Sequence, residues 1–226
     1  SQPFALMVAD VEAAREFVRV DEQARRLLES AAAPIVLLEK AAGENVGEVL
    51  APGNGYLGVM LAYSPLHALL VEAAGPLVVT SGNRHGEPLA TGNEEARERL
   101  AELADFWVMH DREIAVGCDD SVVRLERGRM LAVRRGRGYA PMGMKLPVET
   151  KGAWAWGAEL KAAPAVAQGT QVWMGPHVGD MENLETLEAM EKTGRHLAAL
   201  FGVGVERVVH DAHPGYLSTQ WATRMA

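Results

Sequence analysis

Capped helices alternate with short, mostly apolar strands along this 226-residue chain, and that alternation limits the possible folds more than any other feature. The clearest example begins at Ser64-Pro65, where a capping hydroxyl precedes a proline suited to the first helical position. Leucines at helical spacing follow, Gly75 is suited to end the helix, and the apolar run 77–80 then predicts a buried strand. Helices that alternate with hydrophobic strands predict an α/β layered domain.

The same reasoning assigns the other elements before residue 140. Asp10 and Asp21 are expected to cap two short helices. Thr91-Gly-Asn-Glu94 matches a capping box ahead of a charged helix. In chain order we expect a strand at 1–8, helices at 11–18 and 22–30, a strand at 34–39, a helix from the capping box to about Ala104, a strand at 106–110, and paired strands at 121–125 and 130–134 that turn at Arg127-Gly128.

Proline, glycine, lysine and methionine interrupt the pattern over residues 141–152. We therefore predict a first domain at 1–143, a linker at 144–152 and the start of a second domain at 153–226. The second domain is expected to contain strands at 154–160, 165–168 and 205–210, a helix at 181–201 capped by Asp180 and closed by Gly202, and a last helix from Ser218 or Thr219. Both ends of the chain are abrupt, which suggests an internal piece of a longer protein, with frayed natural termini as the alternative.

Polar side chains stand where predicted strands stop or start. Thr80, Ser81 and Asn83 follow one apolar strand, and Ser121 opens a later one. Ligands of α/β sheets usually bind outside the carboxyl ends of strands, although Ser-Gly-Asn is equally suited to a plain turn. Six arginines crowd the next segment: Arg124, Arg127, Arg129, Arg134, Arg135 and Arg137. Hydroxyls with guanidiniums suggest a phosphate-bearing ligand. Strand alternation places Ser121 and Arg124 on opposite faces, which favours Ser121 as the residue that faces the ligand.

The bulk composition excludes several classes of function. A formal charge of −8 argues against broad nucleic-acid binding, which needs a basic surface. One cysteine excludes an internal disulfide framework and suggests a reducing cytoplasm. No run of about 18 apolar residues is present, so a membrane-spanning helix is not expected.

An ordered set of motifs resembles one known family. Before residue 141 the motifs are Pro3–Met7, Leu57–Leu61, Pro65–His67, Thr80–Asn83, Gly86–Pro88, His110–Arg112, Asp119–Arg124 and Arg134–Tyr139; after residue 152 they are Gly157–Lys161, His177–Asp180, Glu182–Thr186, His210–Pro214 and Tyr216–Thr219. The first group resembles the YrdC-like domain of the HypF carbamoyltransferases. The second resembles the start of the actin-like, ribonuclease-H-like ATPase domain of the same family.

The resemblance implies a twisted mixed-sheet α/β domain followed by part of an actin-like domain. It also implies a cytoplasmic enzyme that makes carbamoyl adenylate from carbamoyl phosphate and ATP. The carbamoyl group then passes to the C-terminal cysteine of a HypE-like acceptor protein and becomes the cyanide ligand of nickel–iron hydrogenase. Mg²⁺ is expected to travel with ATP. The family's metal-binding histidine run would lie beyond Ala226, so no metal ligand is assigned.

The resemblance also suggests residue roles. The candidates for binding nucleotide or carbamoyl adenylate are Thr80, Ser81, Asn83, Ser121, Arg124, Arg134, Arg135, Glu159 and Asn183. The candidate catalytic residues are Lys161, His177 and Asp180. For His177, Asp180 and Asn183, ordinary capping at a helix entry is the alternative interpretation, and for each arginine a solvated surface position.

The chain departs from the family pattern at sites that matter for ATP. Gln2 stands where the family usually has lysine, and Ala162-Ala163-Pro164 replaces Asn-Thr-Phe. These departures motivate a second hypothesis, a non-catalytic binding or scaffold remnant of the fold. A third hypothesis is a threonylcarbamoyl-adenylate synthase of tRNA modification. The fused second domain and the acidic charge count against the third.

Overall fold

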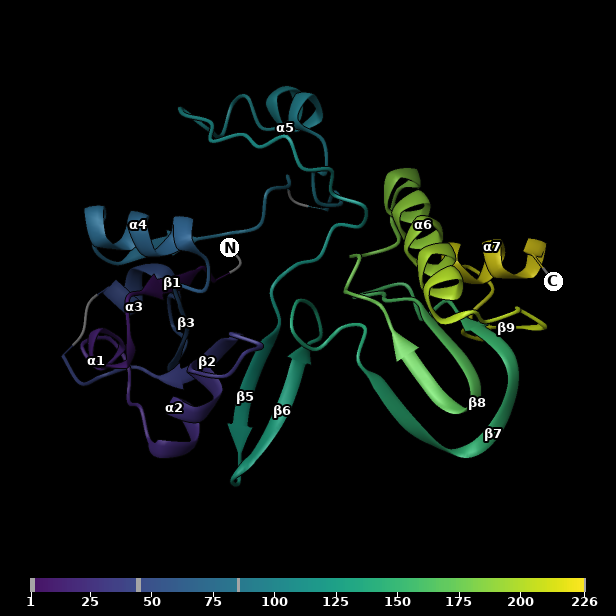
Figure 1. The fold of residues 1–226 in the computed structure, drawn as a ribbon, viewed down its shortest axis with the longest axis horizontal. Coiled ribbons are helices and arrows are strands. Elements are labelled where there is room, and N and C mark those ends of the chain that lie inside the picture. Colours follow the sequence, from purple (N-terminus) through teal and green to yellow (C-terminus); the bar gives the residue numbers. More distant parts are fainter. Residues whose placement is uncertain (1–2, 44–45, 85, 226) are drawn as a thin grey trace. The chain divides into compact units, whose positions relative to one another are not determined.

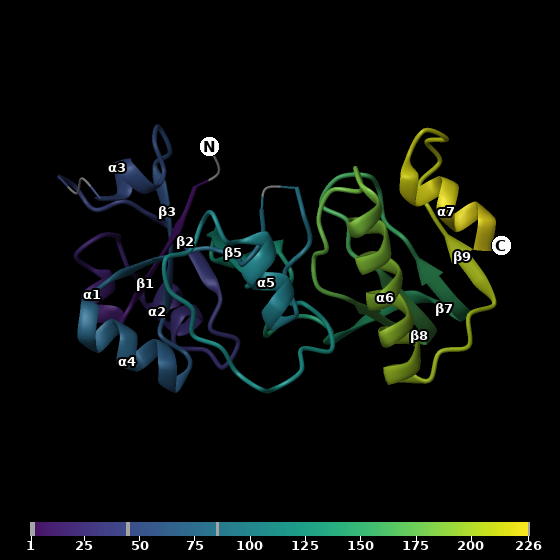
Figure 2. The same ribbon diagram turned by 90° about the horizontal axis from the view of Figure 1, so that it is seen from above.

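The structure, a computed structural model, describes residues 3–43, 46–84 and 86–225 and contains two compact units (Figures 1 and 2). The first unit consists of Ser1–Thr80 and Asp120–Gly138, and the second of Ser81–Asp119 and Tyr139–Ala226. Both units pack helices against a sheet, so the predicted α/β class is confirmed. Gln2 lies outside the described residues. Within the described ranges, no helix has the length and apolar character needed to cross a membrane.

The first unit is built on a six-stranded mixed sheet in the order β4-β1-β3-β2-β5-β6. The strands are β1 (Ala5–Val8), β2 (Ile35–Glu39), β3 (Tyr56–Leu61), β4 (Leu77–Val79), β5 (Val122–Glu126) and β6 (Arg129–Arg134). β1 is parallel to β3 and β2 is parallel to β5, whereas the other neighbours are antiparallel. Val36, Leu57 and Val59 on the two central strands are fully buried and form its core.

The caps of the first unit follow the local chemistry of the sequence. Asp10 and Asp21 accept from Ala13 N and Ala24 N at 2.8 and 2.7 Å, and they start α1 (Val11–Ala14) and α2 (Glu22–Leu28). Ser64 likewise caps α4 (Pro65–Ala74), which Gly75 ends at φ 76°. A further short helix, α3, spans Val46–Leu50. The predicted caps are confirmed, although α1 ends earlier than expected.

Burial around α4 differs from the prediction. Leu66, Leu69 and Leu70 are exposed, and Val71 is the buried residue of the helix. β4 forms as expected but is an edge strand, and Val78 is exposed. An edge strand has a neighbouring strand on one side only. β4 is therefore more exposed to solvent than the buried strand that its composition suggested.

The predicted hairpin of β5 and β6 is confirmed. Arg127 and Gly128 form its two-residue turn with φ values of 49° and 74°. Two consecutive left-handed residues are what a tight hairpin turn requires, and glycine at the second position supplies one of them without strain.

The second unit contains a three-stranded sheet in the order β8-β7-β9, covered by α6 (Figures 1 and 2). β7 (Gly143–Ala155) runs antiparallel to β8 (Ala165–Met174) and parallel to β9 (Arg207–Val209). The stretch 144–152, suggested as a linker, is therefore strand with two register irregularities, and 157–160 is not strand. Pairing with 169–173 supplies partners for the β7 backbone, and a register shift between Lys145 and Thr150 accommodates Pro147.

Two helices complete the core of this unit. They are α6 (Leu184–Phe201), which Gly202 closes at φ 64° as predicted, and α7 (Leu217–Met225). The rings of Trp154 and Trp156 stack at a centroid distance of 5.2 Å inside this core. All five tryptophans of the chain belong to the second unit.

The segment 81–119 of the second unit carries one short helix, α5 (Asn93–Arg99). Its capping carboxylate is Glu95, which accepts from Thr91 N and Gly92 N at 3.0 and 3.1 Å, one residue later than the predicted Glu94. The predicted strand 106–110 is wrong: it pairs with no described strand, and Phe106 is 91% exposed. Strand-forming residues do not make a strand without a partner.

Candidate functional site

Ser121 is fully buried in the first unit, and the protein uses its hydroxyl. The Oγ atom accepts from Gly136 N at 2.8 Å and donates to Arg137 O at 2.9 Å. The predicted alternation is correct, since Val123 is buried on the same face. The hydroxyl that was expected to face a ligand instead joins the start of β5 to the segment after β6.

Arg137, one of the six arginines that crowd this segment of the sequence, contacts other loops of the first unit through its side chain. Its guanidinium donates to Asp120 Oδ1 at 2.8 Å and to the carbonyls of Ala32 and Ala33 at 3.0 and 2.8 Å. Its Cζ atom also lies 3.5 Å from the ring centroid of Tyr63. One side chain therefore joins three separate loops. No local pattern in the sequence announces this role, because every partner is distant along the chain.

We expect Arg137→Lys to destabilise the first unit by about 2 kcal/mol, because a single ammonium cannot serve three acceptors and stack on a ring. Urea unfolding followed by circular dichroism would measure the loss. Arg129→Lys, at an exposed position on β6, is the matched control. Equal stability of the two variants would show that these Arg137 contacts contribute little.

The other predicted arginines are partly engaged by the protein. Arg124 forms an ion pair with Glu126 and lies over the ring of Tyr56, with its Cζ 5.7 Å from the centroid. Arg134 donates from Nε to Asp120 O at 3.0 Å. Arg135 is half-buried. The carboxylate of Glu126 would therefore compete with an anionic ligand for Arg124. The roles of Arg134 and Arg135 stay predictions.

Asn83 holds a turn. Its Nδ2 donates to Arg84 O at 3.0 Å and to Glu87 O at 2.9 Å, and two carbonyl partners fix the orientation of the amide. Its Oδ1 is buried and meets no donor among the described residues. Both N–H groups of the Asn83 amide are therefore used by the protein. The remaining group is an acceptor, which suits an N–H or O–H of a ligand. Thr80 is exposed at the end of the first unit, and Ser81 is half-buried at the start of the second.

In the second unit two distant loops lie side by side. Ala162 N donates to Gly179 O at 2.8 Å, and Val178 N donates to Ala162 O at 2.9 Å. This bridge brings Lys161 to Asp180: the carboxylate accepts from Lys161 N at 2.7 Å and from Nζ at 3.0 Å. Two of the predicted catalytic residues are therefore in contact.

Asp180 does not cap α6, contrary to the prediction. Asn183 is the cap, and its Oδ1 accepts from Thr186 N at 2.8 Å. Burial of the Asp180 carboxyl works to raise its pKa. Hydrogen bonds from the Lys161 backbone and ammonium, with the charges of Lys161 and His177, outweigh burial and lower the pKa below its usual value. Asp180 is therefore a carboxylate that holds a cation.

Glu159 also has a structural partner. Its Oε2 accepts from Leu217 N at 2.9 Å at the start of α7, and its carbonyl accepts from Met181 N at 2.7 Å. A carboxylate at a helix start satisfies an orphan backbone donor. A ligand bound by Glu159, as predicted, would therefore have to share its carboxylate with the backbone N–H of Leu217.

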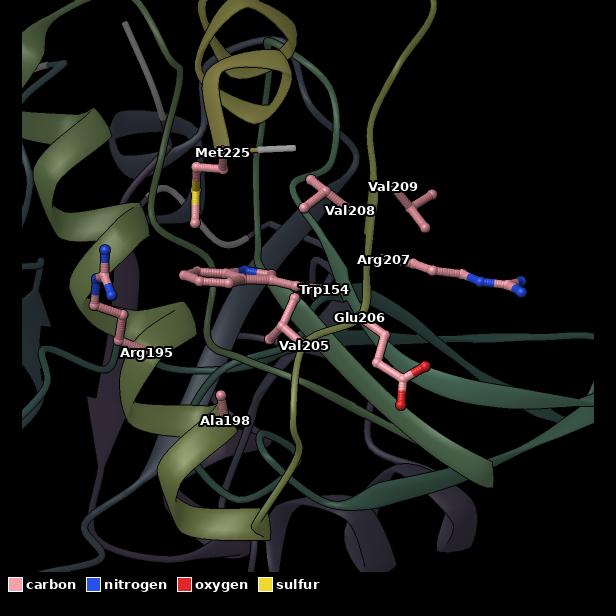
Figure 3. Close-up of a pocket in the computed structure, with 9 residues that line it drawn as sticks. All are labelled: Trp154, Arg195, Ala198, Val205, Glu206, Arg207, Val208, Val209 and Met225. Atoms are coloured by element: carbon pink, nitrogen blue, oxygen red, sulfur yellow. The ribbon is translucent and has the colours of Figure 1, made fainter.

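Two hollows lie in the second unit. One, of about 670 Å³, is lined by the segment 87–117 and the first half of α6, and includes His177, Asn183 and Arg99. The other, of about 820 Å³, is lined by Trp154 of β7, Ala198 of α6 and Met225 of α7, among other residues (Figure 3). The residues that line the second hollow include none of the predicted site residues. The described ranges contain no group of three or more His, Cys, Asp or Glu side chains that could hold a metal ion.

Comparison with known proteins gives consistent matches along the chain. Residues 1–136 match the Sua5, YciO and YrdC family model, described as telomere recombination, and residues 149–226 match the HypF Kae1-like domain. Carbamoyltransferase HypF of Synechocystis is 40% identical over 100% of this chain, and that of Rhodobacter capsulatus is 42% identical over 97%. The chain spans about 30% of the length of each of these relatives.

Solved structures give the same result. Full-length HypF, in a structure described as the phosphate- and nucleotide-bound form, superposes with a TM-score of 0.94 at 39% identity, over 99% of this chain and 30% of that one. HypF of T. kodakarensis superposes with a TM-score of 0.93 at 33% identity, over 100% and 30%.

Proposed function

The chain belongs to the HypF family of carbamoyltransferases, and we propose that it carries residues of a carbamoyl-adenylate-forming domain and of a carbamoyl-transferring domain. The observation that carries the proposal is that both family models match consecutive parts of one chain. We place the functional division within 144–152, between domains at 1–143 and 153–226, although that stretch is a strand. The single cysteine and the acidic charge support a cytoplasmic protein without a nucleic-acid partner.

In the first proposed step carbamoyl phosphate loses its phosphate to water, and an oxygen of the resulting carbamate attacks the α-phosphorus of ATP. The new O–P bond forms as the bond to the β-phosphate breaks, and pyrophosphate leaves. Negative charge grows on the α-phosphate, where preorganised cations and donors lower the barrier. Arg134 and Arg135 are the side chains we assign to that task. The buried acceptor of Asn83 suits the carbamoyl NH₂ or a nucleoside N–H.

In the second proposed step the carbamoyl carbon passes from the adenylate to the C-terminal cysteine thiolate of a HypE-like acceptor. A C–S bond forms, the bond to the phosphate oxygen breaks, and AMP leaves. We assign Lys161, which Asp180 orients, to donate a hydrogen bond to the departing phosphate, with His177 nearby. Mg²⁺ would neutralise ATP phosphates. Because the described residues offer no three-ligand cluster, it would be held chiefly by those phosphates.

The test is exchange of labelled pyrophosphate into ATP by the natural full-length protein. We expect exchange that depends on carbamoyl phosphate, and we expect Arg134→Ala or Ser81→Ala to lower it by about tenfold or more without unfolding the protein. Arg129→Ala, on the same strand as Arg134 but exposed, is the matched control.

Other outcomes would identify the rival hypotheses. Exchange that needs threonine and bicarbonate would indicate the tRNA-modification enzyme. Absence of exchange would favour a scaffold. Full activity of both variants would show that the nucleotide pocket lies elsewhere.

A further inference from the structure

The Asn183 side chain is almost fully used by the protein. Its Oδ1 accepts from the backbone N and the hydroxyl of Thr186, both at 2.8 Å, and Thr186 is buried. Its Nδ2 donates to Gly86 O at 2.9 Å. An amide offers two acceptor sites and two donors, so one N–H remains. These bonds make Asn183 a tether between α6 and the Gly86 turn. Only one N–H of its amide is left to bind a nucleotide.

Hydrogen bonds on both sides of Gly86 join the described residues near it to one another. Asn83 donates to Glu87 O, and the Glu87 carboxylate accepts from Arg99 at 2.8 and 3.0 Å. Arg99 also pairs with Glu95 and donates to Pro88 O at 2.7 Å. The tether therefore holds a braced segment, from Ser81–Asn83 to α5, and not a single loose turn.

The other end of the tether lies next to the Lys161–Asp180 pair. Asn183 follows Asp180 by three residues, and Asp180 binds both the backbone and the ammonium of Lys161. Gly86 lies within the part of the chain that matches the first family model, and Asn183 within the part that matches the second. One side chain thus links the candidate residues of one half-reaction to those of the other.

We propose that Asn183 is a positioning residue that couples adenylate formation to carbamoyl transfer. The coupling rests on the proposed function, whereas the tether itself does not. When the tether is intact, the Ser81–Asn83 segment and the Lys161–Asp180 loop keep a fixed relation. When it is lost, adenylate still forms, but more of it meets water and breaks down to carbamate and AMP before transfer.

The test uses the natural full-length protein with Asn183→Ser and Asn183→Asp. Both replacements keep an oxygen that can cap α6 but remove the donor to Gly86 O. Thr186→Val is the control, because it disturbs the same cap and leaves the donor in place. Hydrogen exchange of residues 84–99 and of α6 would be measured first. The AMP released per carbamoyl transferred, and the rate of pyrophosphate exchange, would be measured next.

We expect both Asn183 variants to speed amide exchange in 84–99. We also expect them to raise hydrolysis of the adenylate relative to transfer, measured as the AMP released in excess of one per transferred carbamoyl, about fivefold, which is the effect of losing one hydrogen bond. The Asn183 side chain is bonded to Gly86 and Thr186 and not assigned to the nucleotide, so pyrophosphate exchange should stay close to the parent value. Thr186→Val should change neither amide exchange in 84–99 nor hydrolysis relative to transfer. Unchanged amide exchange in 84–99 would overturn the tether, whatever the activity. Faster amide exchange with an unchanged AMP ratio would overturn the coupling while leaving the proposed function intact. A parent protein without transfer would overturn the proposed function and the coupling, and amide exchange would still decide the tether.

Discussion

Gly194→Ala is expected to destabilise the second unit by about 3 kcal/mol, although alanine is the better helix former. A Cβ atom at Gly194 would lie 2.1, 2.3 and 2.4 Å from the Cζ2, Cε2 and Nε1 atoms of Trp154. Trp154 cannot easily move, because it is buried and stacked on Trp156. The absence of a side chain at Gly194 is what lets α6 lie directly on β7.

Urea unfolding followed by circular dichroism would test this expectation. Gly204→Ala is the control, because a Cβ there meets no atom within 4 Å. In a Trp154→Leu background the clash is removed, and Gly194→Ala should then be neutral or mildly stabilising. A Gly194→Ala variant as stable as the parent would show that the indole can be displaced at little cost.

Lys161→Met is expected to lower carbamoyl transfer by about a hundredfold, the typical cost of removing one preorganised charged donor from a transition state. The ammonium is already held at 3.0 Å from both Asp180 oxygens, so little reorganisation is needed when charge develops beside it. Pyrophosphate exchange, which reports only adenylate formation, should be unchanged.

Lys151→Met, an exposed lysine of the same unit, is the control for the loss of a positive charge. Lys161→Arg should restore part of the transfer rate, because the charge remains. Transfer at the parent rate in Lys161→Met would exclude the assigned role. Equal losses of exchange and transfer would indicate a general structural defect instead.

The Lys161–Asp180 pair also predicts how the stability of the second unit depends on pH. The pKa of Asp180 is lower in the folded protein than in the unfolded chain. The stabilisation from the pair is therefore complete above the unfolded pKa, near pH ~4, and is lost only as pH falls through the lower folded value. Acid titration of Asp180→Asn against the parent would show this, with the two curves converging at the acid end.

Local chemistry predicted much of the fold. Caps at Asp10, Asp21 and Ser64 depend on a backbone N–H three residues away, and glycines after α4 and α6 depend on a single φ angle. Such signals are contained in a few consecutive residues, which is why the structure confirms them.

Predictions that needed a distant partner were less successful. Asp180 and Asn183 both suit a helix entry, and only Lys161, 19 residues earlier, draws Asp180 away from the cap. The prediction of a strand at 106–110 is wrong because no strand of the described residues lies beside it. The stretch 144–152 is strand because it pairs with 169–173.

The candidate site shows the same division. The sequence suggested Lys161 and Asp180 as candidates, and the structure brings them into contact, while their catalytic role stays a prediction. The bonded roles of Ser121 and Glu159 could not be seen, because their partners lie 15 to 58 residues away.

The confinement of every indole to one unit has a practical use. Intrinsic fluorescence excited at the indole band reports only the second unit, because the first contains no tryptophan. Comparing the emission shift with the loss of ellipticity along one denaturant series would therefore show whether the two units melt together or in succession.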